Sequence, residues 1–391
     1  MKESIHIQNF GPLRDVRIDD IKPLTVLIGD SASGKSTIMK VVALMRYMCM
    51  GHLIERYFGG AQITKSSYSM RFESLLHDGL EQMFNSGTTI KYTVHLPGGL
   101  EHVVDYPNGS SDDFGVLLKF KLGAKDDFFF KESYVAETRS LIPAWSLSGA
   151  TARRDSMGGV FDVMVDDFLE ATDHIRELPL DYLGMKMKVE KKPTRKHFLI
   201  SPNDESSEAF ELEYASSGIQ ASVPLMTIVR YFSHQFSLTN AFRHFVLGDP
   251  KTPLKPWDQD LKKYIHLYIE EPELSLDPKT QCLFINDLIR EAFYRGDNKR
   301  PDDGRQLGLM FATHSPYILN HLNVLLKASY YEKARERYPY INPDEIAVYR
   351  LHDGEVHSLV EDDEETGERI IDTYKFSETM EWILDKYESV D

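Results

Sequence analysis

The sequence predicts an α/β fold with a mixed sheet, an antiparallel β lobe and a helical and hairpin insertion. Three observations predict it. Short, continuously apolar runs, each long enough for one strand, occur at 24–28, 264–269 and 306–313. Each run is followed by a helical pattern, which is typical of parallel strands buried on both faces. After the first strand and helix, alternating segments separated by turns rich in Gly and Pro indicate antiparallel hairpins.

The elements follow one another without repeats or low-complexity tracts. We expect helices at 36–50, 155–180, 218–238, 279–295, 316–323 and 378–387, and further strands at 4–10, 15–21, 89–96, 102–106, 116–122, 184–190 and 209–214, with a hairpin at 345–359. We predict a discontinuous core formed by 1–50 and 210–350, an antiparallel β lobe with a helical and hairpin insertion at 51–209, and a C-terminal hairpin and helix at 351–391.

Composition narrows the class of protein. The chain has 391 residues, 42% of them hydrophobic, which is ample for a buried core. Its two cysteines lack the spacing of a disulfide framework or a zinc site. No apolar run reaches the roughly 20 residues that a membrane helix needs, so we expect a cytoplasmic protein without membrane contact. The net charge of −16 repels nucleic acid on average, so any such contact must be local.

A glycine-rich loop, GDSASGKST, follows the first apolar strand and opens a helix. It matches the pattern G-x-x-x-x-G-K-[ST], in which backbone N–H groups surround a phosphate, Lys35 reaches the β and γ oxygens, and Ser36 offers a hydroxyl to Mg²⁺. A nucleophilic serine would need G-x-S-x-G, which Ser31 and Ser33 do not supply. The predicted nucleotide-binding residues here are Gly29, Ser31, Ala32, Ser33, Gly34, Lys35, Ser36 and Thr37.

Two carboxylates, Glu270 and Glu271, directly follow the strand at 264–269. Adjacent residues at a strand end project differently, so one can serve the metal while the other polarises an attacking water. The alternative is a pair of solvated glutamates. His314 ends another buried strand, where an imidazole can contact the γ-phosphate.

A third segment, YASSGIQASVPL at 214–225, places serines and a glycine before a helix. Backbone N–H groups at such a helix start favour an anion, although an ordinary N-cap has the same residues.

These elements, in this order, resemble the ATP-binding-cassette class of ATPases, in the non-transporter branch that contains the overcoming-lysogenization-defect (OLD), RecF and structural-maintenance-of-chromosomes (SMC) proteins. In that resemblance GDSASGKST is the Walker A motif, SSGIQ the signature, HLYIEEPE the Walker B motif, SLDP the D-loop and ATHSP the switch-histidine loop. The implied fold is an ABC-type P-loop ATPase head.

The resemblance implies ATP and Mg²⁺ as cofactors. It implies that Ser36 and Glu270 serve the metal, that Glu271 is the catalytic base, and that His314 senses the γ-phosphate. It also implies a head-to-tail homodimer or higher oligomer, in which Ser216, Ser217 and Gly218 close on the nucleotide of the opposite subunit.

Three features depart from the family pattern, and they imply slow turnover. Glu270 stands where Asp is usual, Ser31 where Asn or Gln is common, and the signature is SSGIQ rather than SGGQ. YVAETRS at 134–140 resembles an E-x-R segment of OLD-like ATPases, which makes Arg139 a candidate nucleotide-site residue; a surface ion pair is the alternative.

The segments between the motifs exclude some relatives. No sustained heptad pattern separates Walker A from the signature, so long coiled-coil arms are not expected. Only 77 residues follow His314, so we do not expect the nuclease domain of full OLD proteins, and we interpret the acidic run at 361–368 as solvated. The basic stretch at 186–198 fits either a DNA contact or an exposed hairpin. We favour the hairpin.

The sequence is compatible with three functions. The first is an ATP-driven dimeric switch, which the resemblance implies to be the ATPase subunit of an anti-phage defence system controlling a separate effector, such as a nuclease or toxin. The second is a RecF-like DNA-binding ATPase of repair or recombination. The third is a self-contained nuclease that uses the acidic tail.

Overall fold

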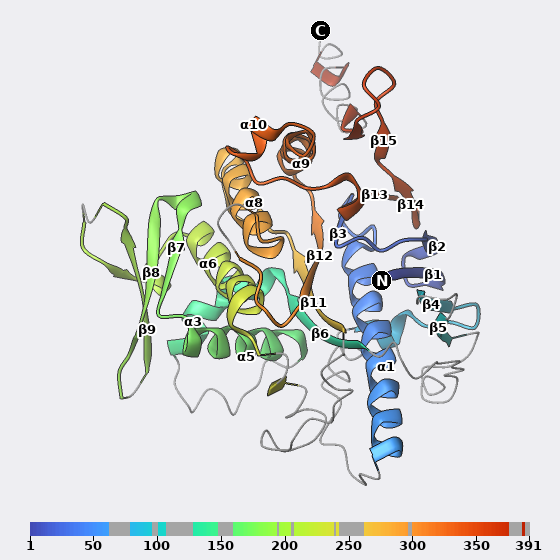
Figure 1. Ribbon diagram of the computed structural model, residues 1–391, viewed down its shortest axis with the longest axis horizontal. Coiled ribbons are helices and arrows are strands. Elements are labelled where there is room, and N and C mark those ends of the chain that lie inside the picture. Colours follow the sequence, from blue (N-terminus) through green and yellow to red (C-terminus); the bar gives the residue numbers. More distant parts are fainter. Residues whose placement is uncertain are drawn as a thin grey trace.

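One large mixed sheet carries most of the protein (Figure 1). The computed structural model describes residues 1–61, 79–95, 101–106, 128–147, 159–193, 195–204, 207–237, 240–241, 262–295, 299–374 and 385–387. The ten strands lie in the order β5-β4-β1-β2-β14-β13-β3-β12-β11-β6. Their bounds are β1 Lys2–Phe10, β2 Leu13–Ile18, β3 Leu24–Gly29, β4 Thr89–His95, β5 Glu101–Tyr106, β6 Phe128–Val135, β11 Lys262–Glu270, β12 Gln306–Thr313, β13 Ile346–His352 and β14 Glu355–Ser358.

The sheet has a parallel half and an antiparallel half. β13, β3, β12, β11 and β6 pair in parallel, whereas β5, β4, β1 and β2 pair antiparallel, as the hairpins β1–β2 and β4–β5 side by side. In β3 the residues at 24–28 are all buried, as expected for a strand covered on both faces. The predicted α/β fold with a mixed sheet is therefore confirmed.

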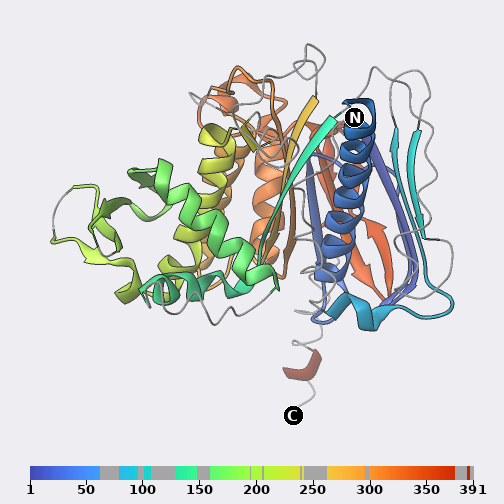
Figure 2. The same cartoon turned by 90° about the horizontal axis from the view of Figure 1, so that it is seen from below.

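Helices cover both faces of the parallel half. Figure 2 shows α1 (Lys35–Ala61) on one side of these strands, with α8 (Pro278–Ala292) and α9 (Pro316–Ala328) on the other. The start of α1 is buried on all sides, in agreement with its apolar sequence. Asp277 caps α8 and Ser315 caps α9, each with its side chain accepting backbone N–H groups. The two caps fix where these helices begin.

A second lobe lies beside β6 and α8 (Figure 1). It contains α3 (Ile142–Leu147), α5 (Gly159–His174), α6 (Ser217–Arg230) and an antiparallel four-stranded sheet in the order β10-β9-β8-β7. These strands are β7 Glu177–Leu180, β8 Met185–Lys191, β9 Lys196–Pro202 and β10 Phe210–Glu211. The basic stretch at 186–198 forms the predicted hairpin, because β8 and β9 pair directly.

Some sequence expectations need correction. The interval 51–209, predicted to hold an antiparallel lobe, contains β6, which no predicted strand covers and which pairs in parallel with β11. The two strands are brought together by the tertiary fold, so no local pattern could reveal their direction. The predicted strand at 116–122 and most of the predicted helix at 378–387 lie outside the described residues. The predicted hairpin at 345–359 is β13–β14, followed by a small pair formed by β15 (Val360–Asp362) and β16 (Arg369–Ile371).

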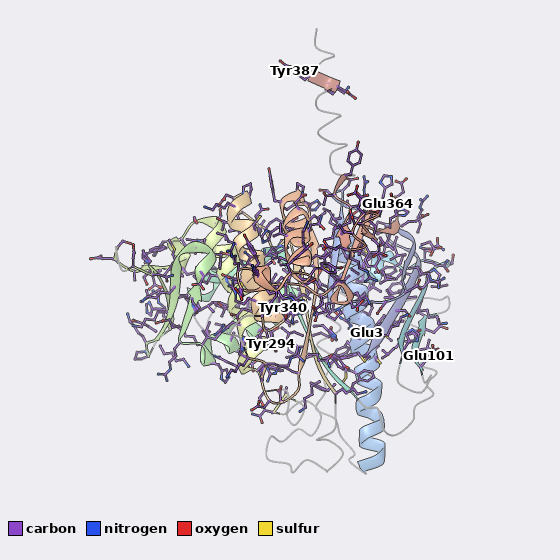
Figure 3. All side chains as sticks on the ribbon, turned by 45° about the horizontal axis from the view of Figure 1, so that its top comes forward. Glu3, Glu101, Tyr294, Tyr340, Glu364 and Tyr387 are labelled. Atoms are coloured by element: carbon purple, nitrogen blue, oxygen red, sulfur yellow. The ribbon has the colours of Figure 1, made fainter. Side chains whose placement is uncertain are left out.

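A buried polar network around Glu3, which is labelled in Figure 3, joins α1 to the sheet. Arg46 donates hydrogen bonds to Glu3 at 2.5 Å and to the Tyr268 hydroxyl at 2.8 Å. Tyr92 donates to the second oxygen of Glu3, and Tyr268 donates to Glu132. Burial is the largest influence on Glu3 and alone would raise its pKa, but the Arg46 guanidinium, with smaller contributions from His266 and the Tyr92 hydroxyl, holds the pKa below its usual value. The network fixes α1, which carries the glycine-rich loop, to strands β1, β4, β6 and β11.

Candidate nucleotide-binding and hydrolysis site

The glycine-rich loop connects β3 to α1 in a conformation that its glycines permit. Gly29 and Gly34 have φ values of +155° and +101°. A Cβ at Gly29 would lie 2.5 Å from the Leu351 carbonyl oxygen, and one at Gly34 would lie 2.5 Å from Leu13. A side chain would therefore displace the loop at both positions.

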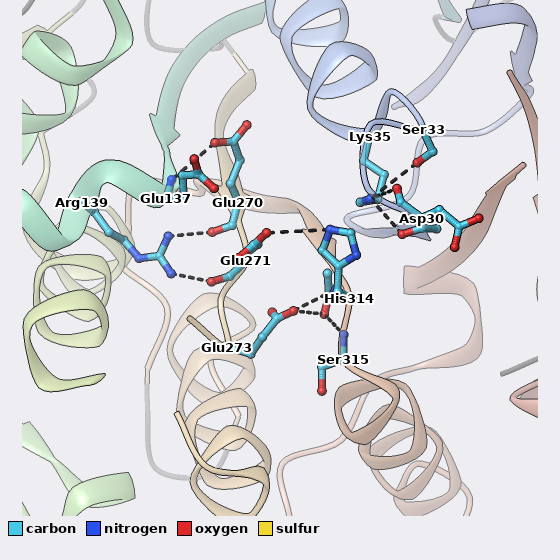
Figure 4. A network of polar contacts seen from close by, with 12 residues as sticks. Asp30, Ser33, Lys35, Glu137, Arg139, Glu270, Glu271, Glu273, His314 and Ser315 are labelled. Carbon is cyan, nitrogen blue, oxygen red and sulfur yellow. Dashed lines mark hydrogen bonds and ion pairs between the residues drawn. The ribbon is translucent and has the colours of Figure 1, made fainter. Parts of the chain in front are cut away.

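Lys35 lies inside this loop. Its ammonium donates to the carbonyl oxygens of Gly29 and Asp30 at 2.9 and 2.8 Å, and lies 3.5 Å from the Ser33 hydroxyl (Figure 4). Lys35 is only 6% exposed, and burial lowers its pKa although nearby carboxylates, Glu271 foremost, oppose this. Within the described ranges Lys35 forms no salt bridge. A buried cation whose hydrogen-bond partners are neutral suits an incoming phosphate.

The other loop residues differ in exposure. Ser31 and Ala32 are exposed, Ser33 and Ser36 are half-buried, and Thr37 is buried against Met83. The open face of the loop is thus formed by the residues that the pattern predicts to surround phosphate.

Glu270 and Glu271 point in different directions (Figure 4). Glu270 accepts a hydrogen bond from the Tyr134 hydroxyl at 2.8 Å and one from the Glu137 backbone N–H at 3.4 Å. Glu271 points toward His314, with 3.8 Å between Oε1 and Nε2. The divergence predicted for two residues at a strand end is therefore present. Glu271 also has a φ of +44°, a left-handed conformation that costs a non-glycine residue about 1–3 kcal/mol.

Glu273 connects the Walker B segment to the histidine loop. Its Oε1 accepts from the Thr313 hydroxyl at 2.7 Å and from the His314 backbone N–H at 2.8 Å. Thr313 in turn accepts from the Ser315 N–H. His314 is thereby held beside Glu271 through its backbone, while its imidazole stays partly exposed.

Arg139 lies under the turn that carries Glu270 and Glu271. It is 0% exposed, which contradicts the surface ion pair considered from the sequence. Its guanidinium donates to the carbonyl oxygens of Glu270 and Glu271 at 2.6 and 2.5 Å, and to those of Ala136 and Ala221 at 3.1 and 3.0 Å. Burial lowers the pKa of Arg139 to about 10, so it remains charged at neutral pH.

The signature residues begin α6 in the second lobe. Ser216 and Ser217 are exposed, whereas Gly218 is buried. A Cβ at Gly218 would lie 2.6 Å from the Ser275 carbonyl oxygen, so only glycine allows this close approach of α6 to the D-loop. No hydrogen bond within the described ranges joins these residues to the loop at 29–37. Their exposed hydroxyls are free to face another molecule.

The predicted metal residues are not brought together by this conformation. Ser36 opens α1, where its hydroxyl suits Mg²⁺, but the carboxylate of Glu270 faces Tyr134 and Glu137. Mg²⁺ is commonly held by one or two carboxylates plus substrate phosphates, so a dedicated protein cluster is not required. Glu270 would have to turn away from Tyr134 to take part.

Sequence reasoning missed Tyr134 and Glu273. Both lie in segments that the motifs already mark, YVAETRS and EEPE. Glu273 could have been found from its position just beyond β11. The neighbouring parallel strand β12 ends at Thr313, so the two residues follow strand ends at the same edge of the sheet. Tyr134 gave no comparable signal, because an aromatic residue in a strand is normally core.

A comparison with known protein families agrees with nucleotide binding by the glycine-rich loop. Residues 1–47 match the model of a family described as "AAA ATPase domain". No curated protein matches the chain. No helix in the described part of the chain combines the length and apolar character that a membrane span requires.

Two solved structures resemble the chain distantly. One is "Crystal structure of the SmcHead bound to the C-winged helix domain of ScpA", with 12% identity, 91% of this chain and 96% of that chain covered, and a TM-score of 0.35. The other is "SMC head domain from Thermotoga maritima", with 14% identity, 92% and 98% coverage, and a TM-score of 0.36. The family match over residues 1–47 and the geometry of the glycine-rich loop support an ATPase.

Proposed function

We propose that the protein is a Mg²⁺-dependent ATPase that acts as a dimeric switch. The observation that carries this proposal is Lys35, a buried ammonium with neutral partners at the start of α1. Phosphate would take over its hydrogen bonds, and the N–H groups of the loop would surround the anion. Mg²⁺, when bound, would neutralise charge on the transferred phosphate, with the Ser36 hydroxyl as a ligand.

The residues beyond Lys35 supply the hydrolytic chemistry. The Glu271 carboxylate accepts the proton of the attacking water, and His314, next to it, contacts the γ-phosphate. Glu273 keeps His314 at this distance through the backbone. The strained backbone at Glu271 is typical of a functional residue.

The partner in this proposal is a second copy of the chain. Ser216 and Ser217 are exposed in the second lobe, beside β6, while Lys35 begins α1 after β3, which is separated from β6 by β12 and β11 in the sheet (Figure 1). A head-to-tail pair would let the signature of one subunit complete the site of the other. ATP would then favour the closed pair, and hydrolysis would release it.

The resemblance to the OLD branch supports a finer proposal. The protein would be the ATPase subunit of a bacterial anti-phage defence system that controls a separate effector, for example a nuclease or a toxin. The RecF-like alternative is less favoured, because Lys191 and Lys196 of the basic hairpin both contact Asp173, and Arg195 lies 3.9 Å from Glu211. The hairpin thus carries less free positive charge than its sequence indicates.

The first test is Glu271→Gln. We expect ATP to bind as before and kcat to fall by at least about 100-fold, because the variant cannot accept the proton. Steady-state hydrolysis and calorimetry measure the two quantities. Wild-type turnover in the variant would remove Glu271 from its proposed role, and an absence of ATP binding to the wild-type protein would refute the function itself.

The second test mixes two inactive variants. Lys35→Met removes phosphate binding, and Ser216→Arg blocks the signature. A mixed dimer keeps one intact site if each site uses Lys35 of one subunit and Ser216 of the other. Mixing equal amounts should therefore restore roughly a quarter of wild-type activity. No recovery, with both variants folded and dimeric, would contradict the composite site.

A further inference from the structure

Arg139 connects two elements of the proposed site that are far apart in sequence. Two of its N–H groups donate to the carbonyl oxygens of Glu270 and Glu271, at the end of β11. Its Nε donates to the carbonyl of Ala221, in the signature helix α6. The fourth bond, to Ala136, closes its own turn. The guanidinium therefore spans the gap between α6 and the backbone of the proposed catalytic carboxylate.

The backbone that Arg139 holds is the strained one. Glu271 has its φ of +44° at the point where its carbonyl accepts from Arg139 and from the Leu274 N–H at 3.0 Å. Its own N–H donates to the Ala312 carbonyl on β12. A residue keeps such a conformation only where its surroundings fix it. Arg139 is one of the groups that fix it.

The signature helix touches the same segment a second time. Gly218 lies three positions before Ala221 and packs so closely on Ser275 that a Cβ would not fit. Both contacts link α6 to 270–276, one through Arg139 and one directly. A shift of α6 must therefore move either the guanidinium or the turn that it holds.

We infer that Arg139 is a positioning residue that makes the orientation of Glu271 depend on the position of the signature helix. This inference rests on the proposed function, since it takes Glu271 as the base and Ser216 as the contact with the other subunit's nucleotide. Engagement of the signature moves α6, Arg139 transmits the movement to the carbonyl of Glu271, and the carboxylate takes its working orientation. Arg139 itself touches no substrate.

The test uses Arg139→Lys in the full-length protein. Lysine keeps the positive charge but cannot donate to Ala221 and to both strand-end carbonyls at once. We expect kcat to fall about tenfold to a hundredfold, because a small misplacement of the base is enough. ATP affinity should stay within about threefold of the wild type, since the phosphate contacts are untouched. Arg305→Lys is the matched control: Arg305 is also buried and donates to a backbone carbonyl, that of Phe232, away from the site.

A double-mutant cycle distinguishes an Arg139 that couples the signature helix to Glu271 from an Arg139 that only stabilises the turn. If Arg139 transmits engagement of the signature, Ser216→Ala combined with Arg139→Lys lowers kcat no more than the worse single variant does. Losses that multiply, or an Arg139→Lys enzyme with wild-type kcat, would overturn the inference. If the wild type hydrolyses no ATP, or Glu271→Gln hydrolyses it normally, the proposed function fails instead.

A measurement without any change at Arg139 covers the case in which Arg139→Lys does not fold. Hydrogen exchange at the Leu274 amide, which donates to the carbonyl of Glu271, reports on the turn. In Glu271→Gln protein, ATP should change this exchange rate, and the added substitution Ser216→Ala should abolish the change. An ATP response that is the same in both proteins would overturn the inference.

Discussion

The molecule buries two cations near its proposed site, and they are bound differently. Lys35, in the loop before α1, contacts two carbonyl oxygens and a hydroxyl of its own loop. Arg139, in the turn after β6, contacts four carbonyls from three separate segments. A cation held only by a local loop can exchange its partners for a ligand. One that joins distant segments is part of the framework, although both have the same charge and similar burial.

The largest expected effects come from replacing each of the two cations with methionine, because the two substitutions should change ATP affinity and stability in opposite ways. Lys35→Met should weaken ATP binding roughly 10- to 150-fold, because a charge-assisted hydrogen bond contributes about 1.5–3 kcal/mol. It should not lower the melting temperature. Folding lowers the pKa of Lys35, so the unfolded chain binds this proton more tightly and the charge opposes folding at neutral pH. This unfavourable contribution begins to fall as the pH rises through the folded-state pKa and is gone above the unfolded-state pKa.

Arg139→Met should behave in the opposite way. We expect a loss of about 1–3 kcal/mol in the free energy of unfolding, because carbonyls in the interior lose a donor. ATP affinity should remain close to that of the wild type. Thermal unfolding and calorimetry on the two variants give the four values that are needed. Equal loss of stability in both variants would contradict the distinction between a ligand-binding and a structural cation.

A smaller effect is expected at Glu273, which links the two strand ends. Glu273→Ala removes the acceptor for the Thr313 hydroxyl and the His314 N–H, so His314 should lose its fixed place beside Glu271. We expect kcat to fall about tenfold, with a stability loss of about 1–3 kcal/mol. Glu273→Gln is the control, because its amide oxygen can accept both bonds. If glutamine is as harmful as alanine, the charge and not the hydrogen bonds is what matters.

The smallest effect is expected on the basic hairpin, far from both cations. Replacing Lys191, Lys192, Arg195 and Lys196 with glutamine should leave kcat unchanged and cost at most about 1 kcal/mol per ion pair, since exposed pairs contribute little. Salt-dependent DNA binding by the wild type that the variant lacks would instead favour the RecF-like function.

Local sequence was sufficient to predict the glycine-rich loop but not what supports it. The order of β3, loop and α1 follows from residues adjacent in the chain, so the place of Lys35 and Ser36 at the start of α1 could be predicted directly, while their contacts with phosphate and Mg²⁺ stay a prediction. Arg139 was marked as a candidate for the nucleotide site, yet its acceptors are 131 and 132 residues away on β11 and 82 residues away on α6. Its burial could not be foreseen from a short E-x-R segment. The direction of β6 was unpredictable for the same reason.

The buried network around Arg46 has a consequence for the order in which the chain folds. Arg46 and Tyr268 are 222 positions apart, and Glu3 and Tyr92 complete the same cluster. During synthesis, α1 leaves the ribosome long before β11 exists, so its guanidinium must wait in water for one of its acceptors. Arg46 can reach Glu3 early, but the cluster is complete only once β11 supplies Tyr268, so we expect the final packing of α1 against the sheet to form late in folding.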